Sequence, residues 1–326
     1  MKVAIVTQPL VDNYGCILQN FALQRTLRDL GHDPITLDYI PLLKWKKYIR
    51  NTLRVLFRGA SYRPLFQKRN PLFVGFVDRN IATVRTGRKY RSSVLSRNGV
   101  QAIVVGSDQV WRLKYNLDTL PDMFLSFAGD FKGPRVAYAA SFGAESWDAK
   151  NEDRSYLAAL AARFKAVSVR EESGIVICRE ALGVEAVVMP DPVLLLTPED
   201  YLALCGTVPE ETDPFLAAYV LDDSPEIEEL IERKANELGL SIKRFTSGRN
   251  ATLTVEEWLA SFRDATCVVT DSFHGAVFAG LFGKPCEIIR NSDRGVSRFE
   301  ILDKEIPPEV LRGTGRIFLK KALTSN

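Results

Sequence analysis

One of the two histidines of this chain lies in a short polar corner between two apolar segments. Residues 268–278 read VVTDSFHGAVF, in which the valines are typical of a buried strand and the residues after Gly275 of a buried helix. In an open α/β sheet, ligands bind outside the carboxyl ends of the strands, often against a helix N-terminus. Because an imidazole exchanges a proton near neutral pH, His274 is a candidate catalytic acid or base.

Other apolar runs also end in small or polar residues, and these ends are candidates for the same site. They are residues 12–15, 106–111, 141–143 and 168–171. Each segment alone is weak evidence, because such residues are common in turns. Among them, Asp108 can orient or deprotonate a hydroxyl, and Arg170 can neutralise a carboxylate or phosphate. Asp271 is best interpreted as structural, accepting backbone hydrogen bonds at its corner.

Strands and helices alternate along the whole chain. Strand-like runs are KVAIVTQ, ITLDYI, QAIVVGS, RVAYAAS, AVSVRE, EAVVMPDP, PFLAAYVLDD, SIKRFTS, TCVVTDS and PCEIIR. This alternation predicts an α/β fold with parallel sheets covered by helices on both faces. We expect two doubly wound, Rossmann-like domains facing a cleft: 1–188, and 189–326 with the C-terminal tail. Asp191-Pro192 between them suits a linker.

Composition indicates an ordinary globular protein: 46% of the residues are hydrophobic, 25% are charged and the net charge is +3. Met1-Lys2 runs directly into a strand-like segment, and no apolar run approaches a membrane span, so we expect a cytoplasmic protein. The five cysteines are scattered without a C-x-x-C pair. We therefore expect neither disulfides nor a metal site.

Basic residues gather in segment 44–91, which holds fourteen Lys or Arg, a single acid, Asp78, and eight interleaved aromatic residues. Two hypotheses remain open. The segment is a solvated surface of the first domain, or it binds an anionic partner such as lipid headgroups or a pyrophosphate-linked substrate. We do not expect nucleic acid as a partner, since no nucleic-acid-binding motif accompanies the charge.

Taken together, seven ordered segments resemble the polysaccharide pyruvyl transferase family. They are NYGCILQNFALQ, VVGSDQVW, YAASFG, SVREESG, DPVLLL, TDSFHG and SRFEIL, from about residue 3 to residue 303. The resemblance implies an architecture similar to the two-domain GT-B glycosyltransferases. It also implies transfer of a pyruvyl group from phosphoenolpyruvate to a sugar of a surface polysaccharide or its lipid-linked precursor, forming a ketal. No cofactor is expected.

The chemistry of the strand-end residues, taken together with the resemblance, gives candidates for each role. The catalytic candidates are His274, Asp108 and Arg170. The candidates for binding the donor are Arg170, Ser272, His274, Gly275, Arg294 and Arg298. The candidates for binding the sugar acceptor are Asn13, Tyr14, Gln19, Ser107 and Asp108, although Asn13 could instead cap a helix while Tyr14 packs.

The chain departs from the family pattern at one point. Ser272 and Phe273 stand where better-studied members have an Arg and a Leu before the histidine, and Ser brings a hydrogen bond but no charge. Arg294 and Arg298, in the polar segment NSDRGVSRF, are candidates to replace that arginine.

Two other functions stay open at this point. One is a GT-B-like glycosyltransferase that uses a nucleotide sugar. The other is a non-catalytic carbohydrate-binding protein of polysaccharide assembly, which would be suggested if His274 and Arg170 were buried and mutually satisfied. For a pyruvyl transferase whose acceptor is a lipid-pyrophosphate-linked oligosaccharide, segment 44–91 would bring the protein to the inner membrane face.

Overall fold

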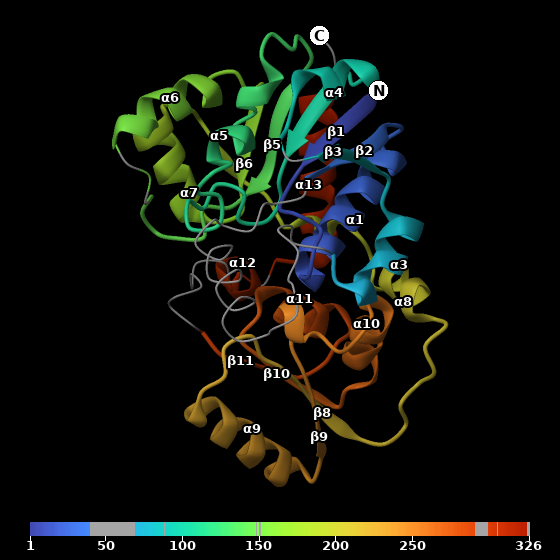
Figure 1. The fold of residues 1–326 in the computed structure, drawn as a ribbon. Coiled ribbons are helices and arrows are strands. Elements are labelled where there is room, and N and C mark those ends of the chain that lie inside the picture. The colour runs from blue at the N-terminus through green and yellow to red at the C-terminus, as the bar shows by residue number, and fades with distance from the viewer. Residues whose placement is uncertain are drawn as a thin grey trace, which may run out of the picture.

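The computed structural model describes residues 1–39, 69–87, 89–147, 149, 151–290, 299–304 and 306–324. Figure 1 shows two layered α/β bodies, one above the other, with both ends of the chain at the outer end of the upper one. We refer to the body built on the first sheet as the first domain and to the other as the second domain.

The first domain is built on a sheet of seven parallel strands in the order β3-β2-β1-β4-β5-β6-β7. The strands are β1 (Lys2–Val6), β2 (Asp33–Tyr39), β3 (Thr83–Gly87), β4 (Ala102–Val105), β5 (Arg135–Ala140), β6 (Ala166–Val169) and β7 (Val187–Val188). Every residue of β4 and β5 is buried, as expected for central parallel strands covered on both faces.

The second domain has a smaller parallel sheet in the order β11-β10-β8-β9. Its strands are β8 (Phe215–Tyr219), β9 (Ser241–Phe245), β10 (Cys267–Thr270) and β11 (Cys286–Ile288). The expected architecture of two doubly wound parallel sheets is therefore confirmed, and the last strand of the first sheet ends at Val188.

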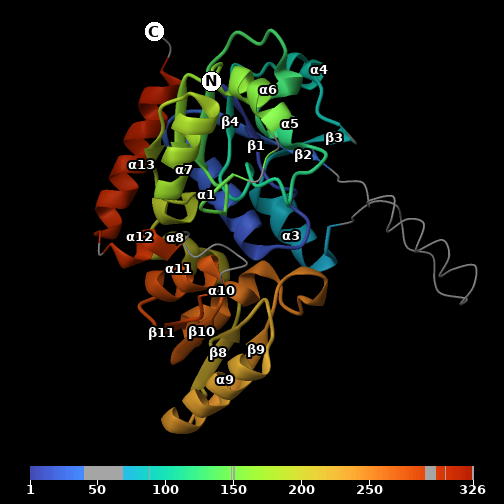
Figure 2. The same ribbon diagram turned by 90° about the vertical axis from the view of Figure 1, so that its left-hand side faces the viewer.

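Helices cover both sheets (Figures 1 and 2). Those of the first half are α1 (Tyr14–Asp29), α3 (Pro71–Asn80), α4 (Ser92–Arg97), α5 (Leu120–Met123), α6 (Asn151–Ala161) and α7 (Glu172–Ile177). The later ones are α8 (Pro198–Cys205), α9 (Pro225–Leu238), α10 (Val255–Asp264), α11 (Phe273–Leu281), α12 (Glu300–Asp303) and α13 (Pro308–Leu323). Short 3-10 turns lie at Ser126–Ala128, Pro192–Leu195 and Gly248–Asn250, and a π-turn at Cys178–Leu182.

The C-terminal helix α13 returns to the first domain, where the red helix lies beside the first sheet in Figure 2. Leu319 and Leu323 share a buried cluster with Val3 and Tyr138, and Arg316 forms an ion pair with Asp29 of α1 at 3.1 Å. The assignment of the C-terminal tail to the second domain is thus wrong for this helix. Its apolar face completes the cover of the first sheet, a long-range pairing that helical periodicity does not specify.

An apolar interface joins the two domains. Tyr14 at the start of α1 stacks on Trp258 of α10, with ring centroids 5.1 Å apart, and it also contacts Phe73 of α3 at 4.7 Å. The three rings belong to one buried cluster that also includes Phe278 of α11. Because this packing fixes α1 against α11, it also sets the distance between the polar corners that precede the two helices.

Residues 44–68 and 88 of the basic segment lie outside the described residues. In the described part, Arg69 pairs with Asp38 at 3.1 Å and Arg79 with Glu256 at 2.7 Å. Phe73 and Phe76 are core residues. These side chains are held by protein contacts, whereas Arg85, Lys89 and Arg91 are exposed, so an anionic partner for segment 44–91 stays a prediction.

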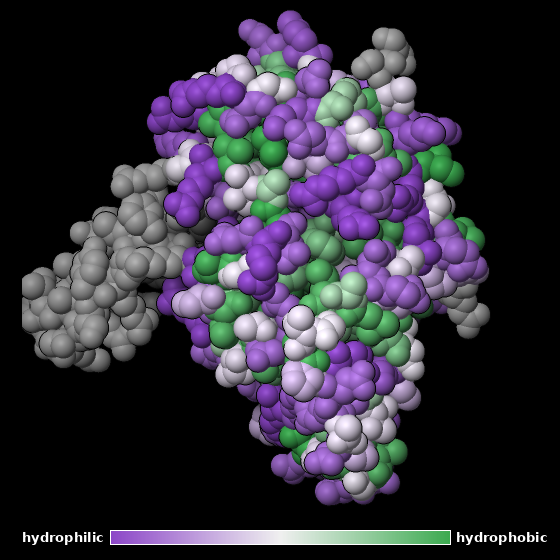
Figure 3. Space-filling model, turned by 90° about the vertical axis from the view of Figure 1, so that its right-hand side faces the viewer, coloured by the Kyte–Doolittle hydropathy of each residue, from purple (hydrophilic) through white to green (hydrophobic). Residues whose placement is uncertain are grey.

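No helix in the described part of the chain is long and apolar enough to cross a membrane. The face shown in Figure 3 carries hydrophobic residues in scattered groups between hydrophilic ones.

Candidate active site

The strand ends of the first domain meet the first turn of α11 from the second domain. Arg170 follows β6, Ser107 and Asp108 follow β4, and Asp191 follows β7. His274 is the second residue of α11. The corners that the sequence singles out on both sides are therefore brought together, and a fifth residue, Asp191, lies between them.

Asp191 is fully buried and lies at the centre of the cluster. Its Oδ2 accepts hydrogen bonds from Arg170 Nη1 at 2.9 Å and Ser107 Oγ at 3.2 Å. The same oxygen lies 3.7 Å from His274 Nε2, and Oδ1 accepts from the backbone N–H of Val193 at 3.1 Å. Burial would raise the pKa of this carboxyl, but His274, Arg170 and the Val193 N–H lower it to about 2. Asp191 is therefore ionised at neutral pH.

Arg170 is a buried cation among three carboxylates. Besides its bond to Asp191, Nη1 lies 4.0 Å from Asp108 Oδ1, and Nε lies 4.0 Å from Glu171 Oε2. The guanidinium lies over the ring of Phe273, 4.9 Å from its centroid. Burial alone would lower the pKa of Arg170, but the carboxylates raise it. Among the described residues, Nε and Nη2 have no hydrogen-bond partner.

His274 is held between the two domains. Its side chain is 11% exposed, and Nε2 faces Asp191 without a hydrogen bond in the described part of the chain. On the other side, the ring lies against Gly15 of α1, where an added Cβ would overlap Nδ1. Thus the position of the imidazole depends on a residue without a side chain at the start of α1.

Glu171 organises the loop after β5. Its Oε1 accepts hydrogen bonds from Ser141 Oγ at 3.0 Å and from the backbone N–H groups of Phe142 at 2.8 Å and Gly143 at 3.1 Å. Burial raises the pKa of this carboxyl, although Arg170 and these bonds oppose the rise. The residue-141 loop is therefore fixed by a residue of the β6 corner.

Asp108 is the most accessible carboxylate of the cluster, with 19% of its side chain exposed. It has a left-handed backbone, with φ of 68°, and Oδ1 accepts from the N–H of Gln109 at 2.8 Å. The strand end before it requires a glycine, because a Cβ on Gly106 would overlap the carbonyl oxygen of Tyr138. This close packing holds the strand end that precedes Asp108 against β5.

The predicted acceptor residues on α1 are committed to contacts within the protein. Asn13 caps α1 by accepting from the N–H of Cys16 at 3.0 Å. The hydroxyl of Tyr14, a fully buried residue, donates to the carbonyl of Leu253 at 2.6 Å. Cap and packed ring are the interpretations that these contacts favour.

Gln19 and Ser107 support the strand end rather than face open space. Gln19 Nε2 donates to Thr7 Oγ1 at 2.9 Å, and its Oε1 accepts from the N–H of Ser107 at 3.1 Å. Ser107 Oγ donates to Ala139 O at 2.8 Å or to Asp191. Acceptor contact by either side chain stays a prediction.

The corner before α11 is used largely for local structure. Ser272 caps the helix, accepting from the N–H of Gly275 at 3.4 Å. A Cβ on Gly275 would overlap Thr270 Oγ1, so the helix start packs tightly on its own strand. Asp271 accepts from the N–H groups of Leu221 at 2.8 Å and Asp222 at 3.0 Å, which confirms its structural role. Arg294 and Arg298 lie outside the described residues.

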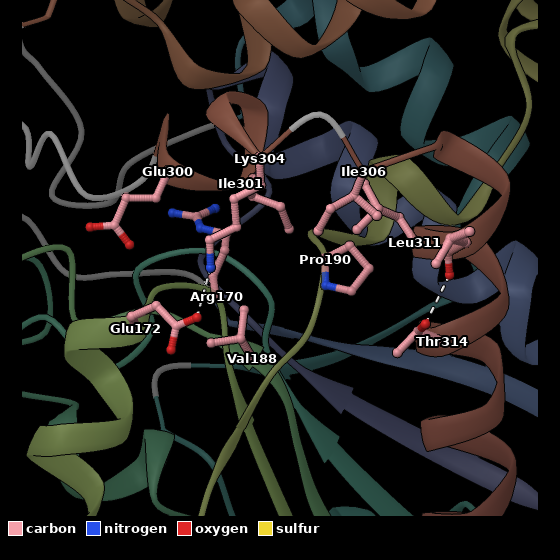
Figure 4. Close-up of a pocket in the computed structure, with 11 residues that line it drawn as sticks. Arg170, Glu172, Val188, Pro190, Glu300, Ile301, Lys304, Ile306, Leu311 and Thr314 are labelled. Atoms are coloured by element: carbon pink, nitrogen blue, oxygen red, sulfur yellow. Dashed lines mark hydrogen bonds and ion pairs between the residues drawn. The ribbon is translucent and has the colours of Figure 1, made fainter.

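A pocket of about 240 Å³ opens beside Arg170, between the end of the first sheet and α12–α13 (Figure 4). Its walls include Val188, Pro190, Ile301 and Leu311. Lys304 lies at the pocket with its ammonium bonded to Glu172 at 2.7 Å. Arg170 is the one residue of the buried cluster among those that line the pocket in the described part of the chain.

A metal site is not evident: the described residues contain no cluster of three His, Cys, Asp or Glu side chains arranged for an ion. The chemical groups at hand are an imidazole, a guanidinium and carboxylates. Such a set suits proton transfer to or from a bound anion.

A family model described as polysaccharide pyruvyl transferase matches residues 13–293. The chain belongs to the polysaccharide pyruvyl transferase family. The match spans both domains and contains every residue of the cluster described above. The comparison with curated proteins finds no match.

Solved structures show that this family member has the GT-B fold. UDP-GlcNAc 2-epimerase from Neisseria meningitidis, bound to UDP-GlcNAc, is 11% identical with a TM-score of 0.52 and covers 99% of each chain. The UDP-GlcNAc 2-epimerase from Methanocaldococcus jannaschii is 14% identical with a TM-score of 0.51, covering 100% of this chain and 93% of its own. At such identities the likeness concerns the fold.

Two residues of this pyruvyl transferase family site escaped the sequence prediction. The interpretation of Asp191-Pro192 as a linker is wrong for Asp191, which follows a strand-like run as Arg170 does. Glu171 was included in a strand-end segment without a role. Because ligands bind outside the carboxyl ends of strands, the end of the strand-like run EAVVMPDP indicates Asp191 as a site residue in the same way as Arg170.

Proposed function

We propose that this protein transfers a pyruvyl group from phosphoenolpyruvate to a sugar of a surface polysaccharide or its lipid-linked precursor, forming a ketal. The family match supports a transferase of this kind. The observation that carries the proposal is the shared cluster of buried His274 and Arg170 around Asp191, in which Arg170 Nε and Nη2 lack hydrogen-bond partners among the described residues. Buried polar groups of this kind are expected where a ligand completes the bonding.

The reaction needs a proton and two hydroxyls. A proton adds to the methylene carbon of the enol phosphate, and a sugar hydroxyl attacks the neighbouring carbon. Phosphate then leaves, and a second sugar hydroxyl closes the ketal. The two hydroxyls release two protons, which equal the proton added to the methylene carbon and the proton carried away on phosphate. We assign the proton transfer to His274 and the orientation of an acceptor hydroxyl to Asp108.

Arg170 is suited to bind the anionic donor. Asp191 holds Nη1, and Nε and Nη2 form the remaining edge of the guanidinium, a fork that matches a carboxylate or phosphate. The pocket lined by Arg170 and Lys304 would admit the donor to this edge.

The charge of the cluster limits what Arg170 does alone. Three carboxylates, from Asp108, Glu171 and Asp191, surround this one guanidinium. A multiply charged donor therefore needs further cations, and we propose Arg294 and Arg298 for that role. Without them, like-charge repulsion would oppose binding.

A nucleotide-sugar transferase is the alternative from another class, because structures with this fold include proteins that bind UDP-GlcNAc. Thermal-shift measurements separate the two. We expect phosphoenolpyruvate to raise the melting temperature of the wild type and to have a much smaller effect on Arg170→Lys, which keeps the charge but loses the fork. Stabilisation by UDP-GlcNAc and none by phosphoenolpyruvate would favour the alternative.

A further inference from the structure

The carboxylate of Asp191 has almost no freedom to rotate. Val193 N–H occupies Oδ1, while Arg170 Nη1 donates to Oδ2 and Ser107 Oγ lies 3.2 Å from the same oxygen. The residue is fully buried. It follows that Oδ2 is held in one place, facing the imidazole of His274 from the other domain at 3.7 Å from Nε2.

An ionised carboxylate can only accept hydrogen bonds. The imidazole nitrogen that faces it is therefore favoured to carry the proton, since two facing acceptors would repel each other. The present distance is longer than a hydrogen bond, as is common for catalytic groups before a substrate is bound, and an approach of about 1 Å would form the bond.

The other groups around His274 do not compete for Nε2. Gly15 of α1 lies beside Nδ1 and has no side chain. The ring of Phe273 lies edge-on at 5.2 Å and offers no acceptor in the ring plane. Arg170 donates to Asp191 Oδ2, the oxygen that faces the imidazole. Because a guanidinium has no acceptor, Arg170 does not compete with Asp191 for a proton on Nε2.

We propose that Asp191 is a positioning residue that holds His274 in the tautomer with its proton on Nε2, leaving Nδ1 to exchange the proton with substrate, while it holds Arg170 by Nη1. One buried carboxylate thereby orients a group from each domain. The exchange with substrate rests on the proposed function, whereas the tautomer is a property of the protein without substrate.

The experiment is nitrogen NMR of ¹⁵N-histidine-labelled protein. The chain has two histidines, so the His32→Gln variant leaves His274 as the single signal. At a pH where the imidazole is neutral, we expect one protonated and one unprotonated nitrogen, with the proton on Nε2. If the His32→Gln protein, in which Asp191 is unchanged, carries the proton on Nδ1 of His274, this result alone overturns the proposal.

Asp191→Asn, in the same background, tests the cause. In this variant the negative charge that favours a proton on Nε2 is gone, and the side chain has one oxygen for the donors on its two sides, Val193 N–H and Arg170 Nη1. We expect the proton to move to Nδ1 and kcat to fall at least about a hundredfold with a smaller change in KM, as for a wrong tautomer in the Ser-His-Asp triad.

Asp38→Asn is the matched control, because Asp38 is another buried carboxylate that pairs with an arginine, Arg69, at 3.1 Å. It should leave the His274 tautomer unchanged. A tautomer that is the same in Asp191→Asn as in the wild type would contradict the proposal, whatever the activity. If the wild type does not turn over phosphoenolpyruvate but the His274 tautomer still changes in Asp191→Asn, only the proposed function is contradicted.

Discussion

The imidazole of His274 lies against Gly15, and no side chain fits between them. His274 belongs to α11 of the second domain and Gly15 to the first turn of α1 of the first. The position of the proposed proton donor is thus set by the opposite domain. Tyr14 of α1 stacks on Trp258 of α10, which packs edge-on against Phe278 of α11, and this aromatic packing holds α1 and α11 in this relation.

Gly15→Ala should displace His274. The added methyl would overlap the ring, and relieving such overpacking costs about 1–3 kcal/mol. We expect turnover to fall at least about tenfold, with a lowered melting temperature. The control is Gly280→Ala in α11, where no atom lies within 4 Å of the added Cβ. That change should stabilise the helix by about 0.5–1 kcal/mol and leave turnover intact; an equal loss in both variants would contradict the contact.

The pH dependence of stability should carry the signature of Asp191. Its pKa in the folded protein is lowered to about 2, so its contribution is complete above the unfolded pKa and is lost as pH falls through the folded one. The full contribution is about 2.5 kcal/mol, of which roughly 1 kcal/mol is lost by pH 3. Urea unfolding at pH 5 and pH 3 measures it, and Asp191→Asn should show a smaller loss between the two pH values. An equal loss in both proteins would count against the lowered pKa.

Arg294 or Arg298 should supply the cation missing at Ser272. Replacing the contributing arginine by Ala should weaken binding of phosphoenolpyruvate by about 1.5–3 kcal/mol, the range for a charge-assisted hydrogen bond. Isothermal titration calorimetry gives this difference directly. If both variants bind as the wild type does, the donor is held otherwise or is a different molecule.

Segment 44–91 should bring the protein to anionic membranes that carry a lipid-pyrophosphate-linked acceptor. Each cation near the surface adds about 1 kcal/mol of attraction to an anionic leaflet, and salt screens it within about 10 Å at 0.1 M. Co-sedimentation with anionic but not neutral vesicles, weakened at higher salt, is the expected result. Equal recovery in the supernatant under all conditions would leave the segment as a solvated surface.

The fold was predictable because its signals are local. Apolar runs such as those ending at Ser107 and Arg170 alternate with helical periodicity, and parallel strands place such ends along one edge. This rule also placed His274 opposite them. By contrast, the return of α13 to the first sheet depends on packing between distant residues, which no local pattern specifies.

The roles of individual site residues were less accessible to prediction. Pro192 made Asp191 resemble a linker, although a buried carboxylate between Arg170 and His274 is what ties the cluster together. Tyr14 and Gln19 occur in a motif that suggested substrate contact, but burial commits their polar atoms to protein partners. Residue type gives the chemistry that is available, while burial and partners decide which atoms remain for a ligand.

Replacing His274 by Ala tests the central claim most directly. Wild-type protein with a polysaccharide acceptor and phosphoenolpyruvate carrying ¹³C at its central carbon should convert the enol signal to a ketal signal in the NMR spectrum, with release of phosphate. We predict that His274→Ala gives no ketal signal yet binds phosphoenolpyruvate within about tenfold of the wild type, since proton transfer contributes mainly to the transition state. Ketal formation by His274→Ala at the wild-type rate would contradict the account.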